Sequence, residues 1–322
     1  MKKISFISLF IICISCEKNE LPIESHSIGD IESYQTIQTI YENQIFYNLE
    51  MNESIKNNLI EDWDLAFDAS EEGWKILINS SRYADITEFE NYTFEDEITQ
   101  TEINAVEKNW DNPKGINYET AIGDYRSKNS IYVINRGYNI NGSPAGYKKM
   151  IIDSIDNQYY NIRYSNLNNS NTRAIQIPKQ NSSHFQYFSF DSDSLIDIEP
   201  NKEQWDLLFT PYTTLYNDPE LPPSYLVRGV FTNYLSNVRV AKDTTEFEKI
   251  NYDMIDSYLF SSTQNYIGYK WKTYVGGNPP YIVHSDTTYI IKSVSDRYFK
   301  LRFIDFFSSG EKGYPKFEIQ EL

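Results

Sequence analysis

Apolar and polar residues alternate along several stretches of this chain, which is the pattern of half-buried β-strands. In residues 298–303 every second residue is Phe or Leu, and a similar run occupies residues 289–294. Only residues 295–297 separate the two runs, a length typical of β-hairpin loops. Residues 151–155 and 159–164 repeat this arrangement, so we expect at least two similar hairpins.

Helical periodicity is scarce, and only residues 52–62 and 246–260 permit a short helix. The other runs are rich in Tyr, Ile, Phe, Val and Thr, which favour strands. Turn residues such as Asn141-Gly142 and Ser309-Gly310 separate them. We therefore predict an all-β fold built from mostly antiparallel, sandwich-like sheets.

A repeat with a period of about 140 residues organises these strands. Residues 63–67, Trp-Asp-Leu-Ala-Phe, recur at 205–209 as Trp-Asp-Leu-Leu-Phe. The other matched segments, in the same order, are 46–49 with 187–190, 122–126 with 267–272, 151–155 with 290–294, 159–164 with 298–303, and 174–177 with 317–320. This ordered set predicts two homologous domains in tandem, residues 31–179 and 183–322. In each Trp-Asp pair we expect the Trp to anchor the core and the Asp to accept hydrogen bonds from backbone amides.

Residues 1–16 are typical of an export signal, because two lysines precede the apolar segment 4–14. Cys16 follows a small residue at the end of that segment, which resembles the lipobox of bacterial lipoproteins, where this cysteine is acylated and becomes the N-terminus. Residues 17–30 have the composition of a flexible tether, and their acidic start resembles the signal for the outer face of the outer membrane. We expect an outer-membrane lipoprotein, anchored in the bilayer through Cys16 and exposed on a Gram-negative cell surface.

Composition narrows the class of partner. The chain has 29 Lys and Arg against 46 Asp and Glu, a net charge of -17, which excludes a nucleic-acid partner because that needs a basic face. Its 27 Tyr and 18 Phe argue against an acidic disordered chain. Both cysteines, Cys13 and Cys16, lie in the export signal, so we expect no disulfide, Cys-ligated metal or Cys nucleophile in the domains.

The second repeat resembles the HmuY family of secreted and surface lipoproteins, and the first repeat does so more loosely. The segments that carry the resemblance, in order, are 187–190, 205–209, 225–229, 268–272, the hairpin 289–303, and 317–320. The resemblance implies an all-β binding protein that is not an enzyme. The best-studied members capture haem and pass it to an outer-membrane receptor, so it implies haem as the cofactor and such a receptor as a partner.

Haem needs an apolar slot and axial ligands such as His, Met or Tyr. In haem-binding members one ligand, His or Met, lies in the loop after the Trp equivalent to Trp271. Here that loop, residues 272–277, offers only Tyr274. The second ligand of the family lies in an earlier variable loop, which corresponds roughly to the region of Met254. With His284, these residues are our haem-ligand candidates, although the ligand set of the family is not reproduced.

Nothing in the sequence predicts a catalytic or metal site. Asp191-Ser192-Asp193 and Asp197 suggest a calcium loop, but the Gly and the distal Glu of an EF-hand are missing, which favours a solvated acidic loop. His26 falls in the tether, and His184 directly precedes a predicted strand. No GxSxG, HExxH or P-loop pattern occurs.

Three functions therefore stay open. The first is a non-enzymatic surface lipoprotein that binds haem or a related tetrapyrrole. The second is a surface adhesion or scaffolding lipoprotein that binds protein or glycan, for which the Tyr- and Pro-rich segment 211–225 offers contact area. The third, a hydrolase, has the least support. Metal-ligating side chains that converge on one apolar slot would favour the first, exposed Tyr patches the second, and a cleft of converging carboxylates the third.

Overall fold

The computed structural model describes residues 32–36, 42–116 and 119–322. All strand pairs in these residues are antiparallel, which confirms the predicted all-β class. One five-stranded sheet has the order β10-β9-β8-β7-β6 (Arg173–Pro178, Tyr159–Ser165, Tyr147–Ile155, Ile131–Asn135, Asp85–Phe89). The other has the order β1-β20-β19-β18-β15 (Glu32–Thr36, Glu311–Glu321, Tyr298–Ser308, Thr288–Lys292, Arg239–Asp243).

Two four-stranded sheets and one small ribbon complete the strands. The sheets are β12-β11-β4-β5 (Ser194–Ile196, Phe185–Ser189, Leu65–Asp68, Ile76–Ile78) and β14-β13-β2-β3 (Ser224–Thr232, Leu207–Leu215, Asn43–Asn48, Glu53–Leu59). The ribbon pairs β16 with β17 (Lys272–Tyr274, Tyr281–Val283). The helices are short: α1 (Gln100–Ala105) and the 3-10 turns η1, η2, η3 and η4 (Ser80–Arg82, Tyr234–Ser236, Phe247–Lys249, Tyr252–Ser257).

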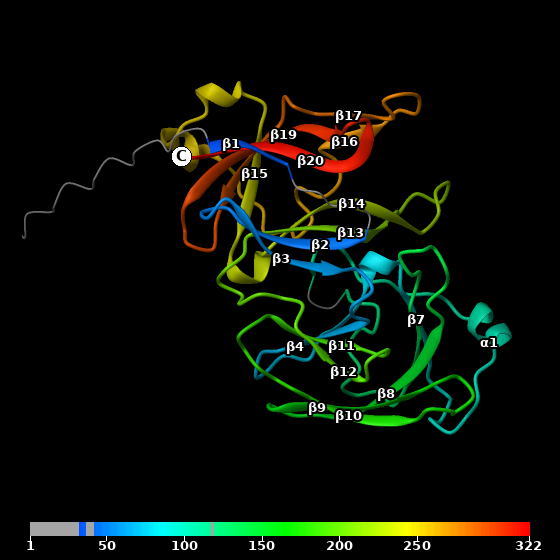
Figure 1. Cartoon of the computed structure of the whole chain (residues 1–322). Coiled ribbons are helices and arrows are strands. Elements are labelled where there is room, and N and C mark those ends of the chain that lie inside the picture. The colour runs from blue at the N-terminus through cyan, green and yellow to red at the C-terminus, as the bar shows by residue number, and fades with distance from the viewer. Residues whose placement is uncertain (1–31, 37–41, 117–118) are drawn as a thin grey trace, which may run out of the picture.

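The four large sheets stack as four layers, with the five-stranded sheets outside and the four-stranded sheets in the middle (Figure 1). One hydrophobic core lies between each five-stranded sheet and its four-stranded neighbour. A third, smaller core lies between the two four-stranded sheets. The middle sheets are therefore buried on both faces, which explains why segments 63–67 and 205–209 are almost continuously apolar rather than alternating.

The two halves of the chain exchange hairpins. In the middle layers β2 of the first half pairs with β13 of the second, and β11 of the second half pairs with β4 of the first. The edge strands follow the same rule, because β1 joins β20. Each sandwich thus contains strands from both sides of the predicted boundary at 179–183.

The Trp-Asp pairs lie at these crossings. Asp206 accepts a hydrogen bond from the amide of Leu49, and Asp64 accepts one from the amide of Phe190, both at 2.8 Å. Trp63 and Trp205 are each 6% exposed in the core between the middle sheets. The predicted structural role of the pairs is therefore confirmed, with the addition that each pair holds a strand of the opposite half.

The two pairs differ in their electrostatics. Asp64 also forms buried ion pairs, at 3.4 Å with Arg82 and at 2.8 Å with Arg136. Asp206 accepts a second backbone amide, that of Val294, at 2.8 Å. The first crossing is therefore held by a backbone amide and two ion pairs, and the second by two backbone amides.

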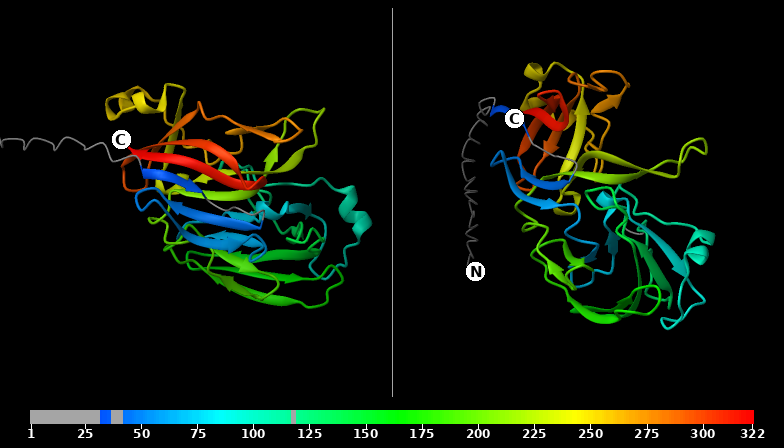
Figure 2. Two further views of the ribbon diagram at one scale, coloured as in Figure 1. Left: turned by 45° about the horizontal axis from the view of Figure 1, so that its top comes forward. Right: turned by 45° about the vertical axis from the view of Figure 1, so that its right-hand side comes forward.

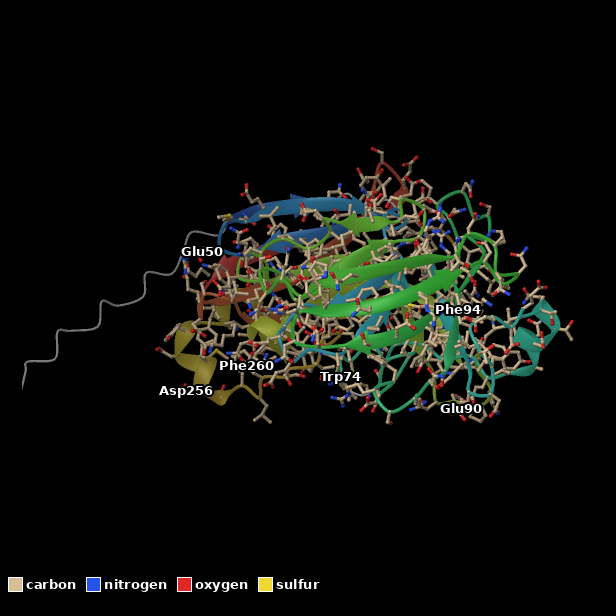
Figure 3. All side chains as sticks on the ribbon, turned by 90° about the horizontal axis from the view of Figure 1, so that it is seen from below. Glu50, Trp74, Glu90, Phe94, Asp256 and Phe260 are labelled. Carbon is tan, nitrogen blue, oxygen red and sulfur yellow. The ribbon has the colours of Figure 1, made fainter. Side chains whose placement is uncertain are left out.

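Segments that connect the strands cover the outer faces of the five-stranded sheets. A buried lysine in each sheet bonds to the segment that covers it. Lys149 of β8 donates to the carbonyls of Phe94 and Asp96, and Lys300 of β19 donates to the carbonyls of Phe247 and Ile250. Figure 3 shows Phe94 over the strands of the first sheet. These contacts make β8 the counterpart of β19.

That equivalence corrects the segment matching at the C-terminal ends of the repeats. The sequence paired 151–155 with 290–294, that is, β8 with β18, and the later matches carry the same shift of one strand. The order of the sheets pairs β10 with β1, not with β20. Alternating aromatic strands resemble one another too closely to fix the register of such a match.

The helix expectations hold only in part. Residues 52–62 contain strand β3 rather than a helix, because β3 completes the sheet of the exchanged β2. Residues 246–260 contain the 3-10 turns η3 and η4. The predicted hairpins at 151–164 and 289–303 are confirmed as β8–β9 and β18–β19. Cys16, the export signal and the tether 17–30 lie outside the described residues.

The charge difference between the two crossings gives a testable prediction. Asp64→Ala should destabilise the protein by about 3–5 kcal/mol, because the buried guanidinium of Arg82 loses its carboxylate and that of Arg136 keeps only Asp191. Asp206→Ala should cost about 1–3 kcal/mol, because it leaves two backbone amides without an acceptor. Urea unfolding followed by circular dichroism would measure both, with the exposed Asp286→Ala as a matched control. An equal or larger loss for Asp206→Ala would contradict the assignment.

Candidate functional site: an apolar surface on two hairpins

Two hairpins of the second half, β13–β14 and β16–β17, start side by side. Val230 of β14 forms an isolated bridge with Gly268, which precedes β16. The backbones approach so closely that a Cβ on Gly229 would lie 2.3 Å from the carbonyl oxygen of Gly268. Gly268 also has a φ of +54°, a conformation that side chains disfavour. Both glycines are therefore required where the hairpins meet.

Lys272 ties the two hairpins together at this base. Its Nζ donates to the carbonyl of Arg228 on β14 at 2.9 Å. The same atom lies 3.9 Å from the centre of the Trp271 ring and 4.6 Å from that of Phe306. Burial lowers the pKa of Lys272 to about 7, and repulsion from Arg228 adds to the effect. The site thus has an amine that is close to half protonated at neutral pH.

Beyond this base, both hairpins expose large apolar side chains. We call this set the hairpin surface: Leu221, Tyr225, Leu226, Tyr274, Val275 and Ile282. Tyr225 is 58% exposed and Tyr274 67%. Figure 2 shows the β13–β14 hairpin, in yellow-green, projecting from the body of the protein. By strand alternation Tyr225 and Leu226 lie on opposite faces of β14, and Ile282, which pairs with Thr273, lies on the face opposite Tyr274, so the set covers both faces of the two hairpins. Exposed apolar side chains on neighbouring hairpins mark a candidate binding surface.

The three haem-ligand candidates do not converge. Tyr274 packs its ring 5.3 Å from that of Tyr281, which contacts Phe306 of the core, so it lies on the core-facing side of the β16–β17 hairpin. His284 Nε2 lies 2.8 Å from Thr273 Oγ1. Because neighbouring residues of a strand point to opposite faces, His284 lies on the other side of the ribbon from Tyr274.

Met254 lies at the other end of β19. It belongs to η4, whose Tyr252 packs against Tyr298 at the start of β19. The β16–β17 hairpin contacts Phe306, eight residues further along the strand. At ~3.3 Å per residue the two ends are about 26 Å apart, too far for one ligand to reach both. In Figure 3, Asp256 of η4 lies at the same end of the molecule as Glu50.

The other sequence candidates are structural. Asp191 pairs with Arg136 at 2.7 Å, and Asp193 pairs with Arg173 at 3.3 Å. His184 Nε2 lies 2.9 Å from both Asn233 Oδ1 and Ser236 Oγ, and burial lowers its pKa to about 4. In the part of the chain that the structure describes, no group of three or more His, Cys, Asp or Glu could hold a metal ion.

A family model described as HmuY protein matches residues 181–319, which include both hairpins. The resemblance that the second repeat shows in sequence is therefore confirmed. The matched residues make up less than half of the chain. No curated protein sequence matches the chain.

Solved structures of HmuY relatives have a distant likeness to the chain. The apo HmuY analogue of Tannerella forsythia is 12% identical with a TM-score of 0.32, covering 91% of this chain and 98% of that one. Apo PinO from Porphyromonas gingivitis is 9% identical with a TM-score of 0.29, covering 90% and 96%. A Bacteroides vulgatus protein described as HmuY-like and heme-binding is 16% identical with a TM-score of 0.19, covering 53% and 90%.

Sequence reasoning found the β16–β17 loop but missed Lys272 and the apolar wall on β14. Lys272 directly follows the apolar Trp271, so the alternation of apolar and polar residues predicts an exposed side chain. The residue types around it do not indicate that it is buried. Tyr225 ends the Tyr- and Pro-rich segment that the sequence singled out, whereas Leu226 lies just outside it. Within the described residues no helix is long and apolar enough to cross a membrane.

Replacing Lys272 with Met should stabilise the protein at pH 7, and the gain should shrink as the pH rises. The folded pKa is about 7 against 10.5 for the free amine, so between these values the unfolded chain binds more protons. The stability that this group contributes therefore rises with pH, by up to ~1.4 kcal/mol per pH unit, and is lost as the pH falls through 7.

Urea unfolding at pH 7, 8 and 9 would measure this effect, with the exposed Lys270→Met as the control. The free-energy difference between wild type and Lys272→Met should narrow over this range, while the control difference stays flat. A difference for Lys272→Met that does not change with pH would contradict the assignment.

Proposed function

We propose that this protein is a non-enzymatic, lipid-anchored cell-surface protein that binds haem or a related tetrapyrrole on the hairpin surface. The observation that carries the proposal is that the HmuY-family region contains both hairpins, and that these hairpins expose the apolar set of Leu221, Tyr225, Leu226, Tyr274, Val275 and Ile282. A tetrapyrrole is flat and apolar on both faces, which suits a surface of aromatic and aliphatic side chains.

Tyr274 is our proposed axial ligand. Tyr is an established axial ligand of haem iron. Its ring lies on the same side of the ribbon as Lys272, the side that is tied to β14, so a ligand on this side would contact both hairpins. His284 occupies the opposite side and is bonded to Thr273, which makes it the weaker candidate.

The position of the N-terminal strand supports a surface role. Strand β1 enters beside β20, with Glu32 paired to Ile319, toward the end of the sheet where β19 starts. The hairpin surface lies at the other end of β19, near Phe306. An anchor at Cys16 would therefore leave the hairpin surface directed away from its attachment, where an outer-membrane receptor could take over the ligand.

Titration of soluble protein that starts at Glu17 with haemin, followed by absorbance, tests the proposal. We expect a saturable, sharpened Soret band at about one haem per chain. Tyr274→Phe should remove the phenolate ligand, lower the affinity at least ~tenfold and change the band. Tyr281→Phe on the same face, His284→Ala, and Met254→Leu at the far end of β19 are matched controls that should leave the affinity within about twofold of wild type.

Two outcomes would overturn this assignment. Loss of the band in Met254→Leu but not in Tyr274→Phe would move the ligand to η4. A titration no different from that of an unrelated acidic protein would reject haem altogether. The hairpin surface with its exposed Tyr side chains would then favour the adhesion role, in which protein or glycan replaces the tetrapyrrole.

A further inference from the structure

A cavity separate from the hairpin surface lies between the two four-stranded sheets, where the halves of the chain meet. Its volume is about 110 Å³. The first half contributes Phe46, Trp63 and Ala66, and the second half contributes Tyr187 and Trp205. The cavity is lined by different residues from the hairpin surface and lies on the other side of sheet β14-β13-β2-β3 from the core next to β16.

The walls are aromatic and arranged in two matching pairs. Phe46 meets Trp205 edge to face, with ring centres 5.0 Å apart at 84°. Trp63 meets Tyr187 in the same way, at 4.9 Å and 88°. In each pair the Trp comes from one half and its partner from the exchanged strand of the other half. Rings in this arrangement present both faces and edges to a further aromatic ring between them.

Most polar groups in the wall already have partners. Trp63 Nε1 donates to Gln44 Oε1 at 2.7 Å, and Gln44 Nε2 donates to Ser81 and Thr210 at 2.8 and 3.0 Å. Trp205 Nε1 donates to Glu199 at 3.3 Å. A ligand therefore has few hydrogen bonds to supply.

One hydroxyl in the wall is different. Tyr187 lines the cavity, and among the described residues its hydroxyl forms no hydrogen bond. A phenolic oxygen can both donate and accept. It offers a single polar contact to whatever occupies the space.

Charged residues also line the cavity: Lys75, Asp111, Glu119 and Glu199. Burial raises the pKa of Asp111 and of Glu199 to about 7 each, so both carboxyl groups are largely protonated below neutral pH. Asp111 accepts the amides of Ile78 and Ala121, and Glu199 accepts the amide of Phe185. These carboxyl groups are committed to the backbone rather than directed at a cation.

The mouth of the cavity is apolar. Ile116 and Leu235 line the cavity and are 43% and 39% exposed. Beside them Gly115 has a φ of +77° and touches the ring of Tyr234, where an added Cβ would lie 2.7 Å away. The amide of Gln264 donates to the carbonyl of Lys114 at 3.1 Å, which fixes this side of the opening to the second half.

We propose that the cavity binds one six-membered aromatic ring that carries a single hydroxyl group, a phenol-type ligand. The size limits the choice, because this cavity, at about 110 Å³, is smaller than the ~150 Å³ apolar cavity that encloses one benzene, and only its open mouth gives a single ring the remaining room. Drug-sized ligands need ~300 Å³ or more. A tetrapyrrole is therefore too large for this space. The aromatic pairs would hold the ring, and the hydroxyl of Tyr187 would bond that of the ligand.

The experiment uses 4-fluorophenol as the probe and its ¹⁹F resonance as the readout, with soluble protein that starts at Glu17. We expect saturable broadening with a dissociation constant of ~1 mM or tighter. Ala66→Leu should fill the space and weaken binding at least ~tenfold, whereas Ala174→Leu on the exposed edge strand β10 should leave it unchanged. If circular dichroism shows Ala66→Leu to be unfolded, Leu208→Phe in the same wall takes its place.

Tyr187→Phe tests the chemistry of the ligand. The substitution should lower the affinity for 4-fluorophenol by about fivefold, which corresponds to the loss of one hydrogen bond, and leave the affinity for fluorobenzene unchanged. No saturable signal, or equal affinity in Ala66→Leu and Ala174→Leu, would overturn the proposal. Haemin titration of Ala66→Leu should match wild type, so the outcome here does not depend on the tetrapyrrole result.

Discussion

The carboxylates of Asp64 and Asp206 each hold a backbone amide from the opposite half of the chain, and the layered structure depends on these two contacts. They bond the residues that directly follow the exchanged strands β2 and β11, whose own pairing places them in the middle sheets. Both middle sheets are buried on two faces, so a slip of one residue would move every side chain into the wrong core. Each half of the chain therefore supplies strands to a middle sheet that the other half begins.

The two halves have diverged around this shared frame. The strands that follow the Trp-Asp pair are four and three residues long in the first half, as β4 and β5, but nine residues each in the second, as β13 and β14. The β16–β17 ribbon is also part of the second half. The extra length leaves the body of the protein and exposes apolar side chains, so the second half carries the candidate binding surface while the first half supplies support.

Much of this fold could be predicted from the sequence, and the limits have physical causes. The strands, the hairpins and the structural role of the Trp-Asp pairs follow from alternation, loop length and the chemistry of a buried carboxylate. The exchange of hairpins could not be predicted, because a strand pattern records which face is apolar but not which partner it meets. The same limit explains the shifted match of β8 and the misassigned helix at β3.

The candidate site could be predicted only where it depends on residues that are close together in the sequence. Tyr274 follows from its place after Trp271, and the Tyr-rich segment from its composition. The distance between Met254 and Tyr274 depends on the length of β19, and the opposite orientation of His284 depends on the pairing of β16 with β17. Both are properties of the assembled sheet, so no inspection of residue types could have separated these three candidates.

The central cavity shows how a repeat generates a site that neither half contains. Gln44 and Phe185 occupy equivalent positions, each two residues before an aromatic residue of the cavity wall, Phe46 or Tyr187. Gln44 satisfies the indole of Trp63, whereas at the other crossing Phe185 cannot, and the indole of Trp205 is satisfied by Glu199 instead. This difference between the repeats thus changes the acceptor of the indole N–H from an amide oxygen to a carboxyl oxygen. The two halves therefore line the cavity differently, and the proposed ring with a single hydroxyl would be oriented by the hydroxyl of Tyr187.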